Sequence, residues 1–189
     1  MILIGTIASS LLQNVDNGVM DALQVITVGP SGASTITFSN IPSTYQHLQI
    51  RAIAKAAPTA TDIGYDLRLA MNSDTTGSNY ECHYLYGNGS GVGAGANTDN
   101  RIIGAAAGSG NANMFAVNIY DILDYANTNK YKVVRALGAD DFNGSGYMIM
   151  YSMLWMNTNA ITSLTFDFHT GPSFGQYSHF ALYGIKGAA

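Results

Sequence analysis

The sequence predicts a single all-β domain, either a β-sandwich or a barrel. Apolar and polar residues alternate with a period of two along much of the chain, which is typical of strands with one buried face. Clusters of Gly, Asn, Ser and Thr separate the alternating runs at short spacing. Glu81 is the only glutamate and lysine is scarce, so the chain lacks the residues that usually build exposed helices.

The alternating runs define the expected strands in chain order. The run 48–55, for example, places Leu48 and Ile50 on one face and Gln49 and Arg51 on the other. About eight to ten strands divided by turn residues is the pattern of a sandwich or barrel. We expect strands at 35–38, 48–55, 65–71, 80–86, 115–120, 132–137, 147–156, 161–168 and 180–185.

The remaining segments predict little regular structure. Residues 9–25 place apolar side chains at helical spacing, although the polar stretch 14–18 interrupts the pattern. Residues 121–125 predict a single helical turn before the next strand. The glycine-rich stretches 87–95 and 104–110 are expected to be long loops of the same domain.

Composition restricts the possible partners. Only 11% of the residues are charged and the net charge is −4, which suits a surface largely covered by neighbouring proteins, or a secreted β protein. Lysines and arginines are scattered singly, which argues against nucleic-acid binding. The apolar opening 1–8 has no basic residue before it and is too short to cross a bilayer, so we expect a strand or docking arm and no membrane contact.

Residues 147–156 are apolar on both faces, whereas a sandwich strand normally shows one face to water. We favour an internal strand that its own chain covers. The alternative is a contact with a second subunit, made by Met148, Met150 and Trp155. Methionine suits that role because it packs adaptably against irregular partners.

A search for catalytic constellations identifies none, so we expect no enzyme activity and no cofactor. Nucleophile-elbow, Walker and dinucleotide motifs are missing. Cys82 excludes an intrachain disulfide because it is the only cysteine, and it permits folding in the cytoplasm. Its neighbour His83 should point to the opposite face of the strand, so a buried cysteine is the better interpretation than a nucleophile. Isolated histidines are expected to be structural: His47, His83, His169 and His179.

Two loop regions have both a functional and a structural interpretation. Residues 141–146 resemble the first half of a calcium loop, but the closing glutamate is missing and a hairpin turn explains them equally well. Near the 87–95 stretch, Tyr84, Tyr86 and Asn88 combine aromatic rings with an amide, as glycan-recognition surfaces do. We favour the structural interpretation of these three as strand-edge and turn residues.

Several stretches of the chain resemble a group of tailed-phage virion proteins that comprises structural, head-decoration and tail-fibre proteins. The matching stretches are STITFSNIPSTYQHLQI at 34–50, NY at 79–80, DYANTNKYK at 124–132, LWMNTNAITSL at 154–164, FGQYS at 174–178 and ALYGIK at 181–186. The resemblance implies a jelly-roll-like antiparallel sandwich carried on a virion, with no catalytic residues to transfer. We therefore divide the chain into an N-terminal docking arm or strand, residues 1–33, and one β-sandwich domain, residues 34–189.

These observations lead us to expect a capsid decoration, or cement, protein. It would be made in the host cytoplasm, form a homotrimer and bind the major capsid protein on the outer capsid surface. The alternative is a receptor-binding or tail-fibre tip module that recognises a host glycan. A third possibility is a depolymerase-like glycosidase using Asp140 or Asp141. The expected docking residues are the apolar side chains of the arm: Ile2, Leu3, Ile4, Leu11 and Leu12.

Overall fold

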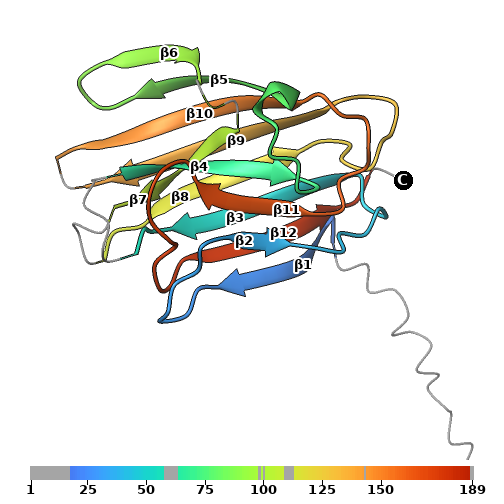
Figure 1. The fold of residues 1–189 in the computed structure, drawn as a ribbon, viewed down its shortest axis with the longest axis horizontal. Helices are drawn as coiled ribbons and strands as arrows, with labels where there is room; N and C mark the ends of the chain where they lie inside the picture. The colour runs from blue at the N-terminus through green and yellow to red at the C-terminus, as the bar shows by residue number, and fades with distance from the viewer. Residues whose placement is uncertain are drawn as a thin grey trace, which may run out of the picture.

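Two antiparallel β-sheets face each other in the computed structural model, which describes residues 18–57, 64–97, 99, 101–108, 113–142 and 144–187 (Figure 1). In spatial order, the eight-stranded sheet contains β1 (Met20–Thr27), β12 (His179–Ile185), β3 (His47–Ala54), β8 (Ala116–Ile122), β9 (Lys132–Asp141), β10 (Gly146–Trp155), β5 (Tyr80–Gly87) and β6 (Val92–Ala96). The four-stranded sheet contains β2 (Ile36–Phe38), β11 (Leu164–Phe168), β4 (Gly64–Met71) and β7 (Ile102–Ala107). A short 3-10 turn, η2 (Gly77–Asn79), leads into β5.

The strand pairing is nested. The strand β1 pairs with β12, β2 with β11, β3 with β8, and β4 with β7, always antiparallel. Two further hairpins, β5–β6 and β9–β10, are inserted between these pairs and widen the eight-stranded sheet. In Figure 1, β5 and β6 form the edge of this sheet, beyond β4 of the smaller sheet.

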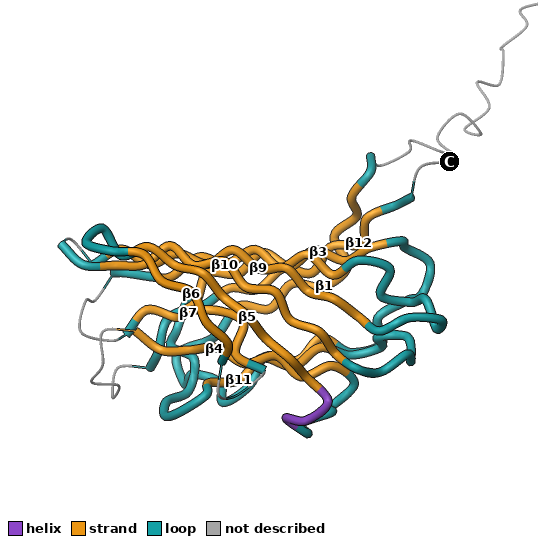
Figure 2. The backbone as a smooth tube through the Cα atoms, turned by 90° about the horizontal axis from the view of Figure 1, so that it is seen from above, coloured by secondary structure: helices purple, strands orange, loops and turns teal. Residues whose placement is uncertain are grey.

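The core lies between the two layers, which Figure 2 shows from above, with β4, β7 and β11 on one side of β3, β9 and β10. Alternate residues of β3, β8 and β9 point into it, as the period of two requires. Phe166 of the small sheet packs against Tyr120 at 5.0 Å and Phe180 at 5.4 Å between ring centroids. Burying each such ring contributes about 1.5–3 kcal/mol of hydrophobic free energy.

Two buried polar side chains satisfy backbone groups that no strand partner reaches. The amide of Asn118 in β8 accepts a hydrogen bond from the Ala105 N–H at 3.0 Å and donates one to its carbonyl at 2.8 Å, which ties the two sheets together. The Lys132 ammonium donates to the carbonyls of Asn127, Lys130 and Thr158 at 2.6, 2.8 and 3.0 Å. These bonds compensate for its burial, which lowers the pKa of Lys132.

All the expected strands are present in the structure, with ends that differ by a few residues. The helical spacing expected over 9–25 is wrong in its described part, since β1 begins at Met20. The physical reason is a β-bulge. The pairing partner of Ala22 is Tyr183 and that of Gln24 is Leu182, so Leu23 is an extra residue that breaks the alternation.

The two expected glycine-rich loops contain strands β6 and β7, which corrects that prediction as well. Every residue of β7 is buried, so no polar side chain alternates with its alanines to reveal a strand. In the expected turn at 121–125, β8 continues to Ile122 and a turn follows. The docking residues Ile2, Leu3, Ile4, Leu11 and Leu12 lie outside the described residues.

Candidate functional site

The unequal size of the two sheets creates the candidate site. The small sheet ends at β7, which lies against β8, β9 and β10. The strands β5 and β6 extend past it, so part of the inner face of the large sheet has no opposing sheet (Figure 1). A cavity of about 450 Å³ opens there between the two layers. Its lining includes five tyrosines, two carboxylates and an amide: Tyr65, Tyr84, Tyr86, Tyr147, Tyr151, Asp66, Asp140 and Asn97.

Four of the tyrosines form a continuous ladder on the wall made by β5 and β10. Tyr84 lies opposite Tyr151 in the strand pairing, with 6.3 Å between ring centroids. Tyr84 and Tyr86 are 6.2 Å apart, and Tyr86 and Tyr147 are 5.8 Å apart. The alternation of the strands directs these rings to the cavity side of the sheet.

Glycines of β6 make room for two of these rings. Gly95 pairs with Tyr84 and Gly93 with Tyr86. A Cβ at Gly93 would lie 2.7 Å from Cε1 of Tyr86, and one at Gly95 would lie 3.0 Å from the Tyr84 hydroxyl. The alternating glycines therefore form a strand whose bare face accommodates the aromatic rings, a known way of protecting glycine in a sheet.

The carboxylates give the cavity a negative character. Partial desolvation by the walls raises the pKa of Asp66, although His169 nearby opposes the shift and the side chain still reaches solvent. Burial also raises the pKa of Asp140, whose Oδ1 accepts the Tyr147 N–H at 2.8 Å. Burial, then the charges of Asp66 and Asp140, raise the pKa of Tyr151. The described residues that line the cavity include no lysine or arginine.

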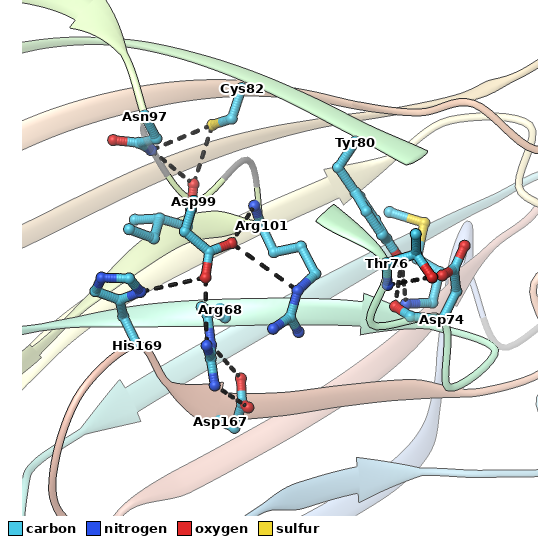
Figure 3. Close-up of polar contacts among 12 residues, drawn as sticks. Arg68, Asp74, Thr76, Tyr80, Cys82, Asn97, Asp99, Arg101, Asp167 and His169 are labelled. Carbon is cyan, nitrogen blue, oxygen red and sulfur yellow. Dashed lines mark hydrogen bonds and ion pairs between the residues drawn. The ribbon is translucent and has the colours of Figure 1, made fainter. Parts of the chain in front are cut away.

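A charged network supports the neighbouring edge of the small sheet (Figure 3). Arg68 donates to both oxygens of Asp167, at 3.1 and 2.6 Å, and to Asp99 at 3.3 Å. Asp99 also contacts Nδ1 of His169 at 3.2 Å. Burial opposes ionisation of Asp99, but hydrogen bonds from the Arg101 N–H and from Arg68 hold its pKa below the usual range. These charges satisfy one another, so the network is structural.

A second feature lies on the opposite side of the same strands. Two rows of exposed apolar side chains run across the large sheet, one from β8 to β5 and the other from β3 to β6, because pairing partners share a face. One row runs through Ile119, Leu137, Met150 and Leu85, and the other through Ile53, Val117, Met148 and Val92. The most exposed members are Val92 at 90% and Met148 at 64%. We call these eight residues the outer apolar face.

The expectation that the chain covers both sides of 147–156 is wrong among the described residues, since Met148 and Met150 are exposed. The expectation that Trp155 contacts a second subunit together with Met148 and Met150 is also wrong. Trp155 points to the inner face of the sheet, is 1% exposed, and its Nε1 donates to Asp74 at 2.9 Å. It stacks on Tyr80 with 6.4 Å between ring centroids, so its side chain is unavailable to a partner on the outer apolar face.

The structure brings two of the three expected glycan-contact residues together. Tyr84 and Tyr86 line the cavity, but Asn88 lies in the turn between β5 and β6. There its Oδ1 accepts the N–H groups of Ser90 and Gly91, and it lines a separate depression. The sequence pattern does not single out Asp66, Tyr147 or Tyr151, although tyrosines at even spacing in two strands are a usable signal.

The other site residues behave structurally. Cys82 is buried as predicted, and burial raises its pKa to about 11. His83 is exposed on the other face of β5. Asp141 and Gly146 pair across the turn that joins β9 to β10, which confirms the predicted hairpin. Within the part of the chain that the structure describes, no three His, Cys, Asp or Glu side chains gather as a metal site would require.

No protein-family model, curated protein or solved structure matches this chain. The described residues also contain no helix long and apolar enough to cross a membrane.

Proposed function

We propose that this chain is a non-enzymatic structural protein of a phage virion, a capsid decoration protein on the outer capsid surface. The observation that carries the structural role is the outer apolar face, which indicates that the chain assembles with other protein chains. Large contiguous apolar patches are uncommon on the surfaces of monomeric soluble proteins and often mark contacts with other proteins. The stretches that resemble phage virion proteins supply the biological setting.

The nested strand pairing supports a jelly-roll fold. In a jelly roll, a long hairpin is wound into a double Greek key, so the first strand pairs with the last and the second with the second-last. The pairs β1–β12, β2–β11, β3–β8 and β4–β7 follow this scheme, with β5–β6 and β9–β10 as insertions. Jelly rolls are frequent in viral capsid and lectin domains. Because a fold alone does not define a function, this point is weaker than the outer apolar face.

The partner on the outer apolar face is a second copy of this chain, and the assembly is a homotrimer. Apolar side chains that stay exposed after folding favour a partner that is available where the chain is made. Another copy of the chain is always available there. Burying each large aliphatic side chain of the face contributes about 1.5–3 kcal/mol before the entropic cost of association. The arm then docks the trimer on the major capsid protein through Ile2, Leu3, Ile4, Leu11 and Leu12.

Decoration works by mass action. A protein that binds the assembled lattice and not its free subunits stabilises the lattice by a free energy of RT ln(1 + [L]/Kd) for each site. Here [L] is the concentration of the free decoration protein and Kd is its dissociation constant from the lattice. The chain therefore needs no catalytic group, only complementary surfaces and enough copies.

The first test is the copy number relative to the major capsid protein in purified virions, measured by quantitative mass spectrometry. Near-stoichiometric amounts support decoration. A ratio of a few per cent or lower overturns it and places the protein in the tail.

The second test is the oligomeric state by sedimentation velocity at micromolar concentration. The unmodified protein should sediment with the mass of three chains, and Leu137→Lys and Met150→Lys should each shift it towards the monomer. The matched control is Val25→Lys, which alters an exposed apolar residue of β1 outside the outer apolar face. A monomeric unmodified protein, or an oligomer that neither face variant weakens, overturns the assignment.

A further inference from the structure

The cavity and the outer apolar face are independent features of the same strands. Successive residues of β5 alternate between them, with Tyr84 and Tyr86 in the cavity and Leu85 on the outer apolar face. A partner on one side therefore leaves the other side open. The cavity volume of about 450 Å³ lies within the usual range of small-molecule sites.

The tyrosine ladder provides an extended stacking surface. Its rings follow one another at 5.8–6.3 Å between centroids along one wall, with Tyr65 on the strand β4 of the other sheet. The apolar C–H faces of a pyranose ring stack on aromatic rings, and tyrosine adds a hydroxyl at the polar end. A row along one wall suits an elongated ligand better than a compact cation, which aromatic side chains surround on several sides.

The polar groups restrict the ligand further. Ionised carboxylates only accept hydrogen bonds, so Asp66 and Asp140 require a ligand that donates. Sugar hydroxyl groups do so. The absence of a basic side chain among the described lining residues makes the cavity repel anions such as phosphates and uronic or sialic acids.

Partial burial raises the pKa of both carboxylates, although Asp66 is exposed to solvent and the Asp140 Oδ1 already accepts the Tyr147 N–H. Hydrogen bonds from ligand hydroxyl groups would stabilise the charged forms, so binding would lower these pKa values. Asn97 also lines the cavity, and its amide nitrogen already donates to the Ile102 carbonyl at 3.0 Å. Its Oδ1 atom is an acceptor for a further ligand hydroxyl.

From this arrangement we infer that the cavity binds a neutral saccharide, stacked on Tyr84, Tyr86 and Tyr147 and hydrogen-bonded to Asp66 and Asp140. The inference does not depend on the location of the protein in a virion. It assigns recognition of a neutral glycan to the side of the sheet that self-association leaves exposed.

The test is saturation-transfer NMR and titration calorimetry on the full chain with neutral trisaccharides: maltotriose, cellotriose, mannotriose and chitotriose. Sialyllactose and choline chloride represent the anionic and cationic ligand classes. Tyr86→Leu removes a ring of the ladder and Asp66→Asn removes a charged acceptor. Their matched controls are Tyr131→Leu, half exposed outside the cavity, and Glu81→Gln, exposed on the other side of β5.

At least one neutral trisaccharide should bind, and each cavity variant should weaken binding about tenfold or more, the loss expected for a charge-assisted hydrogen bond or a stacking ring. The controls should leave the affinity unchanged. Circular dichroism verifies that each variant is folded. The inference is overturned if no neutral trisaccharide binds at about 10 mM, well above a millimolar Kd. Binding of choline or sialyllactose alone, or saccharide binding that both cavity variants retain, overturns it too.

Discussion

Replacing Tyr120 by Phe should stabilise the protein. Tyr120 is fully buried at the centre of the sandwich, and its hydroxyl has no hydrogen-bond partner among the residues that the structure describes. A buried polar group without a partner costs about 1–3 kcal/mol. The ring keeps its contact with Phe166 when the hydroxyl is removed, so we expect the free energy of unfolding to rise by about 1–2 kcal/mol.

The same hydroxyl explains why position 104 is glycine. A Cβ added at Gly104 would overlap the Tyr120 hydroxyl oxygen, so the buried ring would have to shift by a large distance. Gly104→Ala alone should therefore cost about 1–3 kcal/mol, the usual penalty for overpacking a core. With Phe at position 120, the nearest remaining atoms are the Asn118 Oδ1 and ring Cζ, both at 3.2 Å, which small shifts accommodate.

A double-mutant cycle by urea denaturation at fixed protein concentration measures both effects. We expect a coupling of about 1–2 kcal/mol between Gly104→Ala and Tyr120→Phe. Tyr177→Phe is the control, since Tyr177 is 67% exposed and the change should stay within about 0.5 kcal/mol. A less stable Tyr120→Phe variant would show that the hydroxyl is satisfied. Purely additive effects would refute the proposed clash.

Three further predictions concern buried charged and thiol groups. Lys132→Met should lower the free energy of unfolding by about 2 kcal/mol, because three carbonyls lose their donor; urea midpoints measure this, and an unchanged midpoint would contradict it. Asp99 has a folded-state pKa below its unfolded value, so its contribution to stability is present above about pH 4 and disappears as the pH falls further. Thermal melts from pH 6 to pH 3 should show a smaller loss in Asp99→Asn than in the unmodified protein; equal losses would refute the assignment. Cys82, buried and with its pKa raised to about 11, should react with a thiol reagent at pH 8 only after unfolding; rapid labelling of the folded protein would contradict this.

The strands with one buried face could be predicted because alternation is a local property. In β3, Leu48 and Ile50 are buried and Arg51 is exposed, as the spacing indicates. Strand β1 was missed because one bulged residue, Leu23, shifts the apolar positions to a helix-like spacing. Strands β6 and β7 were missed because glycine and alanine carry little hydrophobic signal.

The candidate site depended on contacts that sequence spacing does not report. Tyr84 and Tyr86 were recognised as a pair, but Tyr147 and Tyr151 join them only through the pairing of β5 with β10. Asp66 reaches the cavity from the other sheet. Met150 and Trp155 are close in the chain, but their odd separation places them on opposite sides of the sheet.

The sequence by itself determined the all-β class, most strands and the buried state of Cys82, since each depends on local alternation and composition. The tertiary structure decided which strands face one another. Because eight strands lie against four, the inner face of β5 and β10 stays partly uncovered and forms the cavity. The long-range pairing also aligns Leu85, Leu137 and Met150 from three strands into one exposed row. Both features arise from the register between distant segments, which no single stretch of the chain encodes.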